Sequence, residues 1–135
     1  MRLVADANVL LAAVLGGRAK AVFEHPEIDE LLTAEATLAE VQEYAVILAR
    51  KRRLSLDTLL LAIAALPVTV VEQAVYSPAL PQARRLIAKP DPDDVDVLVL
   101  ALHMKIPLWS NDNDFEGTGI EWYTTAELLR KLVVK

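Results

Sequence analysis

The side chains in this sequence that could do chemistry are mostly carboxylates. The 135 residues include no cysteine and only two histidines, which lie far apart in the sequence. These counts exclude a thiolate nucleophile and a cysteine zinc site, and they argue against a histidine metal site or a Ser-His-Asp triad. Nineteen Asp and Glu against fourteen Lys and Arg give a net charge of −5, which argues against a polycation that grips nucleic acid.

The acidic residues that are candidates for a site fall in four separate segments, and each has an ordinary structural interpretation. Asp6 and Asn8 can form a turn that caps the next helix, and Glu40 can be the partner of Thr37 in a capping box. The other acids can belong to solvated turns and a helix N-terminus: Asp91, Asp93, Asp94, Asp96, Asp112 and Asp114. Taken together, they raise the possibility of a shared site.

Carboxylates that converge repel one another unless a cation lies between them. Mg²⁺ prefers oxygen ligands, and an acidic set without Cys and with few His suits Mg²⁺ or Mn²⁺ better than Zn²⁺ or copper. A divalent cation in such a site can activate water and stabilise an in-line displacement at phosphorus. The acidic set therefore indicates metal-dependent phosphoryl chemistry.

The elements that would position these acids alternate between strands and helices. Strands are predicted at 3–5, 31–33, 68–71, 108–110 and 121–123, and helices at 9–15, 19–23, 37–53, 55–66, 80–87, 95–104 and from 124 or 125 to 132. This alternation predicts an α/β protein, a three-layer α/β/α sandwich with a short, mainly parallel central sheet. Functional groups of such sheets gather at the carboxyl ends of the strands, where Asp6, Ser110 and Asp112 fall.

No repeat, low-complexity tract or linker divides the sequence, so we expect a single domain over residues 1–135. The apolar segment that precedes Asp6 is too short for a secretory signal. The Leu-rich stretch at 59–66 is too short to cross a membrane. We therefore expect a cytoplasmic protein with no membrane partner.

The order of the motifs resembles a PIN domain, the fold of the VapC-type ribonuclease toxins. Four segments carry the resemblance, and they span nearly the whole chain in the order of the family: 4–10, 33–41, 93–102 and 107–115. The resemblance implies that four acids act as metal ligands and catalytic groups: Asp6, Glu40, Asp94 and Asp112. It also implies an accessory ligand, Asp114, and supporting roles for Asn8 and Ser110.

Two positions near these acids leave alternatives open. Asp93 takes the role of Asp94 as metal ligand if the alignment shifts by one residue. Asp96 lies where relatives often have Pro or a small residue and is not expected to be a ligand. Glu43, one helical turn beyond Glu40, is expected to face solvent.

The resemblance implies an Mg²⁺- or Mn²⁺-dependent endoribonuclease, the toxin of a type II toxin-antitoxin pair. Two alternatives stay open: a catalytically silent PIN-type RNA-binding or scaffold protein, and a Mg-dependent phosphatase. The phosphatase pattern, however, requires an acid at the position of Asn8. Arg18 and Lys20 are the candidates for contact with the RNA backbone, since the cations at 50–53 also suit the C-terminal end of a helix.

The helices at 37–53 and 55–66 carry more apolar residues than one buried helix face requires. The surplus consists of Val46, Ile47, Leu54, Leu56, Leu59, Leu60 and Leu61. These residues either complete the core or form a surface for a partner. PIN toxins resemble one another in dimerising and in being capped by an antitoxin peptide, so we expect a homodimer and a possible cognate antitoxin.

Overall fold

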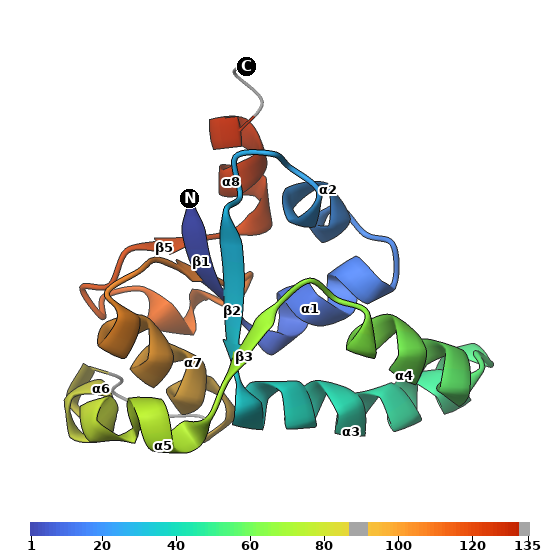
Figure 1. The fold of residues 1–135 in the computed structure, drawn as a ribbon, viewed down its shortest axis with the longest axis horizontal. Coiled ribbons are helices and arrows are strands. Elements are labelled where there is room, and N and C mark those ends of the chain that lie inside the picture. Colours follow the sequence, from blue (N-terminus) through green and yellow to red (C-terminus); the bar gives the residue numbers. More distant parts are fainter. Residues whose placement is uncertain (87–91, 133–135) are drawn as a thin grey trace.

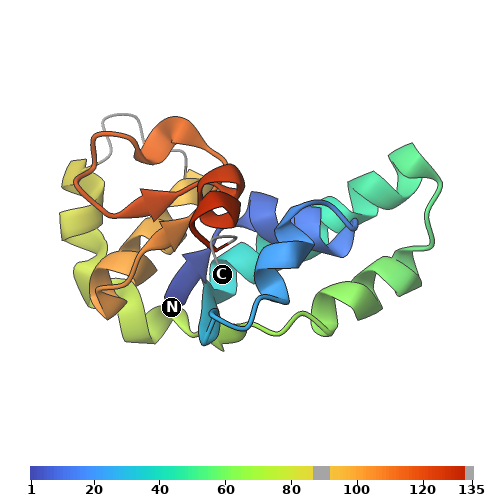
Figure 2. The same cartoon turned by 90° about the horizontal axis from the view of Figure 1, so that it is seen from above.

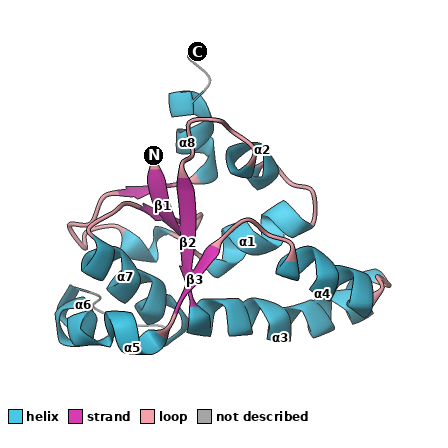
Figure 3. Cartoon of the chain, viewed as in Figure 1, coloured by secondary structure: helices cyan, strands magenta, loops and turns pink. Residues whose placement is uncertain are grey.

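Five short parallel strands form one sheet at the centre of the fold (Figures 1 and 3). The computed structural model describes residues 1–86 and 92–132, and the side chains of 92–94 lie outside this description. The strands are β1 (Arg2–Ala5), β2 (Glu30–Ala34), β3 (Thr69–Val71), β4 (Leu108–Trp109) and β5 (Trp122–Tyr123). They lie side by side in the order β3-β2-β1-β4-β5.

This strand order places a topological switch point between β1 and β4. The chain starts in the centre at β1, adds β2 and β3 on one side, and then crosses to the other side for β4 and β5. In open α/β sheets, ligands bind in the crevice at the carboxyl ends of the strands where the order reverses. The residues that follow β1 and β4 therefore occupy the position where such a fold builds its site.

Successive residues of the central strands point to opposite faces of the sheet, and both faces are buried. Leu3 and Trp109 belong to the core on one face, whereas Val4 and Leu108 belong to the core on the other. This alternation follows from the two-residue period of a strand. Because both faces are covered by helices, the buried residues of β1, β2 and β4 are mostly apolar, as is typical of parallel sheets.

Helices cover each face of the sheet and complete the three layers. One face packs against α1 (Ala7–Val14), α2 (Ala19–Phe23), α3 (Glu35–Arg52), α4 (Leu56–Ala64) and α8 (Thr125–Leu132). The other packs against α5 (Gln73–Tyr76), α6 (Leu80–Leu86) and α7 (Pro92–Met104). Two 3₁₀ turns, η1 (Ser77–Ala79) and η2 (Asn113–Phe115), complete the elements of the described residues. The predicted α/β/α class is confirmed.

Helices α3 and α4 form an arm that extends away from the sheet (Figure 2). The surplus apolar residues divide on this arm: Leu59 is buried and Leu56 is partly buried, while five others are exposed, namely Val46, Ile47, Leu54, Leu60 and Leu61. Leu61 is 72% exposed. For these five residues the interpretation as core is wrong, and the surface interpretation stands.

The N-terminal caps predicted for two helices are wrong. Helix α3 begins at Glu35, so Thr37 lies inside its first turn and cannot cap it. The spacing Thr-x-x-Glu does form a capping box at the start of α8, where the Glu127 N–H donates to Thr124 Oγ1 (3.2 Å) and the Thr124 N–H donates to Glu127 Oε1 (3.0 Å). Helix α7 begins at Pro92, so residues 93 and 94 lie in its first turn instead of preceding it.

The segment between β3 and α6 also differs from the prediction, because α5 and η1 occupy residues 73–79, for which no element was expected. No helix in the described ranges combines the length and the apolar character needed to cross a membrane.

Candidate metal and nuclease site

Asp6 lies at the carboxyl end of β1 and caps the start of α1. Its side chain is buried, with 3% of its surface exposed. Oδ1 accepts a hydrogen bond from the Ala7 N–H (2.8 Å), and Oδ2 accepts one from the Ser110 hydroxyl (2.7 Å). The Asp6 N–H donates to the Trp109 carbonyl (3.0 Å). The pairing of β1 with β4 thus brings Asp6 next to Ser110, which lies 104 positions away in the sequence.

Ser110 is the centre of the hydrogen-bond network. Besides donating to Asp6, its fully buried Oγ accepts from the Asp112 N–H (3.0 Å) and from Asn8 Nδ2 (3.3 Å). The Ser110 N–H donates to the Tyr123 carbonyl (3.0 Å), and the Ser110 carbonyl accepts from Trp122 Nε1 (2.9 Å). These bonds to β5 fix the position of the hydroxyl relative to the sheet.

Asn8 and Asn111 hold the loop after β4 in place. Asn8 Oδ1 accepts from the Asn111 N–H (3.2 Å), and Asn111 Oδ1 accepts from the N–H of Thr125 at the start of α8 (2.8 Å). Asn111 follows a strand in the sequence, between Ser110 and Asp112, but no role was predicted for it. The loop that carries Asp112 is therefore anchored to both α1 and α8.

The carboxylates of this cluster repel one another. Burial raises the pKa of Asp6; the hydrogen bonds from Ser110 and Ala7 act against this, and the charges of Asp112 and Asp114 raise the pKa further. The Asp112 side chain is half-buried and its Oδ1 accepts from the N–H of the exposed Asp114 (3.0 Å). A buried acid beside two further acids has the oxygen donors that a hard divalent cation prefers.

The other predicted acids are placed less completely. Glu40 is half-buried in the second turn of α3, and Asp93 and Asp94 lie in the first turn of α7 with side chains outside the described part. Within the described residues, no three His, Cys, Asp or Glu side chains form a group that could hold a metal ion. The ligand set therefore stays a prediction. Glu43 is exposed, as expected.

The two candidate RNA-binding cations have different surroundings. Arg18 is exposed at the start of α2 and lines a cavity of about 320 Å³ together with Asn111 and Thr125. Lys20 is also exposed, and its Nζ lies 3.8 Å from Glu24 Oε1. Arg18 is thus the cation that adjoins the network through Asn111.

Solved structures that share this fold include the three that follow. PAE2754 from Pyrobaculum aerophilum has a TM-score of 0.74 at 17% identity, over 100% of this chain and 91% of that chain. A toxin-antitoxin complex from Klebsiella pneumoniae has a TM-score of 0.67 at 18% identity, over 91% and 97%. Mycobacterium tuberculosis VapC20, described as a sarcin-ricin loop cleaving toxin, has a TM-score of 0.62 at 18% identity, over 87% and 95%.

The family assignment rests on the sequence as well as the fold. No curated protein sequence matches the chain, but the family described as PIN domain matches residues 4–133. This range runs from β1 through α8 and includes all four segments that carry the resemblance. The chain therefore belongs to the PIN domain family.

Proposed function

We propose that this PIN protein is a metal-dependent endoribonuclease, the toxin of a type II toxin-antitoxin pair. The observation that carries the proposal is the position of Asp6, a buried carboxylate at the switch point of the sheet, next to the acidic loop of Asp112 and Asp114. A buried acid whose charged form is disfavoured by its surroundings is typical of a functional site.

The donor chemistry of this cluster fits Mg²⁺ or Mn²⁺. Asp6 and Asp112 would hold the ion together with Glu40 and Asp94, or Asp93 in place of Asp94, with Asp114 as an accessory ligand. A bound divalent cation would lower the pKa of a water molecule and stabilise negative charge on the leaving oxygen. It would also offset the burial and the repulsion that together raise the pKa of Asp6.

The neighbouring residues have positioning roles in this proposal. Ser110 holds Oδ2 of Asp6 and the backbone of Asp112, so one hydroxyl fixes the two acids relative to each other. Asn8 ties the same hydroxyl to the loop through Asn111. Arg18, in the adjoining cavity, would bind a phosphate of the RNA backbone.

The α3–α4 arm is the surface that we assign to protein partners. Five large apolar side chains are exposed on it, and a cavity of about 290 Å³ lies beside them, lined by Leu15, Leu54 and Leu59 among others. Exposed apolar patches of this kind mark interaction sites. Because the K. pneumoniae structure is a toxin-antitoxin complex, an antitoxin helix and a second copy of this chain are the partners we propose.

The alternative is a catalytically silent PIN protein that binds RNA. The observation in its favour is that no three acids within the described residues form a metal-binding group. The phosphatase alternative is disfavoured, because the position that requires a general acid holds Asn8, whose amide is engaged with Ser110 and Asn111.

Cleavage of a mixed RNA pool tests the proposal. The protein is incubated with Mg²⁺, with Mn²⁺ or with EDTA, and fragments are quantified for the wild type, Asp6→Asn and Asp94→Asn. We expect metal-dependent internal cleavage that falls at least about 100-fold in both variants. Asp57→Asn, at an exposed acid in the first turn of α4, is the matched control and should cleave normally. Cleavage by Asp6→Asn and Asp94→Asn at the wild-type rate would refute the proposal, and RNA binding without cleavage would support the silent alternative.

A further inference from the structure

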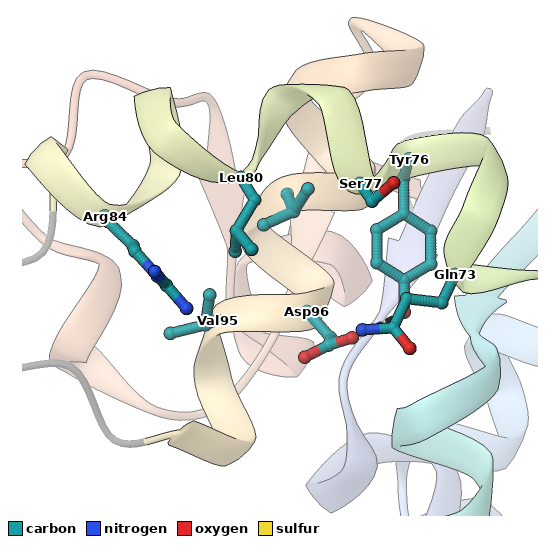
Figure 4. A pocket seen from close by; sticks show the side chains of 8 residues that line it. Gln73, Tyr76, Ser77, Leu80, Arg84, Val95 and Asp96 are labelled. Atoms are coloured by element: carbon teal, nitrogen blue, oxygen red, sulfur yellow. Dashed lines mark hydrogen bonds between the residues drawn. The ribbon is translucent and has the colours of Figure 1, made fainter.

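A second cavity, separate from the Asp6 network, lies between α7 and the segment formed by α5, η1 and α6 (Figure 4). Its volume is about 430 Å³, within the range of sites for small ligands. Its walls include Gln73, Tyr76, Leu80, Arg84, Val95 and Asp96. The proposed function uses none of these residues.

The cavity has polar ends and an apolar middle. Figure 4 shows Arg84 at one end, Gln73, Tyr76 and Asp96 together at the other, and Leu80 and Val95 between them. This arrangement suits an elongated ligand with an anionic group at one end, a flat apolar body, and a hydrogen-bonding edge at the other end.

Asp96 is held in a fixed orientation. Tyr76, which is 2% exposed, donates its hydroxyl hydrogen to Asp96 Oδ2 (2.5 Å). No other hydrogen bond to the Asp96 carboxylate occurs among the residues that the structure describes, so Oδ1 can accept from a ligand. At the opposite end, Arg84 is exposed and forms no ion pair with any acid in the described ranges. Both ends are therefore available to a ligand.

The cavity adjoins the helices that carry two of the proposed metal ligands. Asp96 follows residue 94 on α7 by two positions, about 3 Å along the helix axis and about 200° around it, so the two positions lie on different faces of the helix. On the other side, the Gln73 N–H donates to Glu35 Oε1 (3.5 Å) at the first residue of α3, the helix that carries Glu40. Because Glu35 follows β2 and Gln73 follows β3, a ligand in the cavity would lie at the carboxyl end of the sheet, the same end as the proposed cleavage site.

We propose that this cavity binds one nucleotide of the RNA substrate and selects guanine; the proposal rests on the proposed nuclease function. Arg84 binds a phosphate, the base lies between Leu80 and Val95, and its Watson–Crick edge meets Asp96. Guanine presents two adjacent N–H donors, N1 and N2, to this carboxylate: Oδ1 accepts one, and Oδ2, which already accepts from Tyr76, accepts the other with its second lone pair. Uracil presents a single N–H between two carbonyl oxygens, which the Asp96 carboxylate repels.

Equilibrium binding of single nucleotides tests the cavity without any cleavage. The metal-free wild-type protein is titrated with GMP, AMP, CMP and UMP, and binding is followed by NMR or calorimetry. We expect GMP to bind at least tenfold more tightly than UMP, about 1.4 kcal/mol. Asp96→Asn should remove most of this preference, and Arg84→Ala should weaken all four nucleotides to a similar extent. Tyr76→Phe should reduce the preference for GMP, because it releases Asp96.

Arg85→Ala is the matched control, since Arg85 is the neighbouring exposed cation on α6 and does not line the cavity. Its nucleotide affinities should equal those of the wild type. Any of three results would overturn the proposal: equal affinity for GMP and UMP, no binding at millimolar nucleotide, or an equal loss of nucleotide affinity in Arg84→Ala and Arg85→Ala. Thermal melts of every variant separate loss of binding from loss of folding.

Cleavage kinetics separate this proposal from the proposed function. In a cleaving protein, we expect Arg84→Ala to raise the KM for RNA about tenfold with kcat little changed, whereas Asp6→Asn lowers kcat. Unchanged KM in Arg84→Ala would overturn the cavity proposal and leave the nuclease intact. If no variant cleaves RNA but GMP is selected as described, the nuclease proposal fails and nucleotide binding at the cavity stands.

Discussion

Replacing Ser110 with alanine tests the hydrogen-bond network that holds the acidic cluster together. The substitution removes a charge-assisted bond to Asp6 and an acceptor for the Asp112 N–H, both inside the protein. It also removes the longer bond from Asn8 Nδ2 (3.3 Å), but Asn8 keeps Asp6 Oδ2 as an acceptor (3.4 Å). A bond to an ionised group contributes about 2 kcal/mol and a neutral one about 1 kcal/mol, so we expect a loss of about 3 kcal/mol at pH 7. For a chain of this size, this corresponds to a fall of roughly 10 °C in Tm.

The loss should depend on pH. The Ser110 hydroxyl favours the ionised form of Asp6 and so lowers the pKa of this group. The charge-assisted part of its contribution is therefore present above the folded-state pKa of Asp6 and is lost as the pH falls through that value. In acid, with Asp6 protonated, both bonds are neutral and the loss should decrease to about 2 kcal/mol.

Urea denaturation from pH 4 to pH 8 in EDTA measures this difference for the wild type and Ser110→Ala. Ser77→Ala is the control, because Ser77 is exposed and donates only a long bond of 3.5 Å to the Ala74 carbonyl; its effect should stay below about 0.5 kcal/mol. A loss in Ser110→Ala below about 1 kcal/mol, or one that does not change with pH, would refute the reasoning.

Further substitutions test single features of the structure. Asp6→Asn should leave the metal-free protein at least as stable as the wild type, because it removes a carboxylate that burial and the charge of Asp112 disfavour. In the wild type, Mn²⁺ at 100 times its Kd should stabilise the fold by about 2.7 kcal/mol. Thermal melts should show that Asp6→Asn abolishes this stabilisation. Between the ordinary Asp pKa of 3.8 and the raised pKa of Asp6, the folded state holds the Asp6 proton more tightly than the unfolded state does. In EDTA, the free energy of unfolding of the wild type should therefore fall as the pH rises through this range. The same pH titration of Asp6→Asn should lack this slope. In urea denaturation, Thr124→Ala should lower the free energy of unfolding by about 1 kcal/mol, because it removes the capping box with Glu127. Thr37→Val should raise it by roughly 1 kcal/mol, since the buried Thr37 hydroxyl has no partner among the described residues. The opposite order of stabilities would contradict both assignments.

The layers of the fold were predictable because their signals are local and periodic. Short apolar runs such as residues 3–5 and 31–33 alternate with helical patterns, and this alternation alone implies a parallel sheet between helices. The helix starts were harder, because Thr-x-x-Glu occurs at both Thr37 and Thr124. Strand β2 runs directly into α3 at Glu35, so packing decides that Thr37 is buried inside the helix.

The candidate site was predictable only in part. Asp6 directly follows one predicted strand and Ser110 ends another, so their meeting could be inferred from the sheet alone. The loop through Asn111 depends on bonds between residues more than 100 positions apart, such as that from Asn111 to Asn8, which no local pattern encodes. The same holds for the second cavity, where a bond between Tyr76 and Asp96 joins two helices across 20 positions.

A crystal of the protein soaked in Mn²⁺ tests the central claim most directly, because the anomalous signal of manganese marks the ion itself. We predict one strong peak at the carboxyl ends of β1 and β4, at about 2.0–2.3 Å from carboxylate oxygens of Asp6 and Asp112, with Glu40 and Asp94 completing the set directly or through water. Two results would contradict the assignment of this PIN protein as a metal-dependent nuclease. One is a manganese peak elsewhere in the protein. The other is no peak at saturating Mn²⁺, with the carboxylates of Asp6, Glu40, Asp94 and Asp112 too far apart to share an ion.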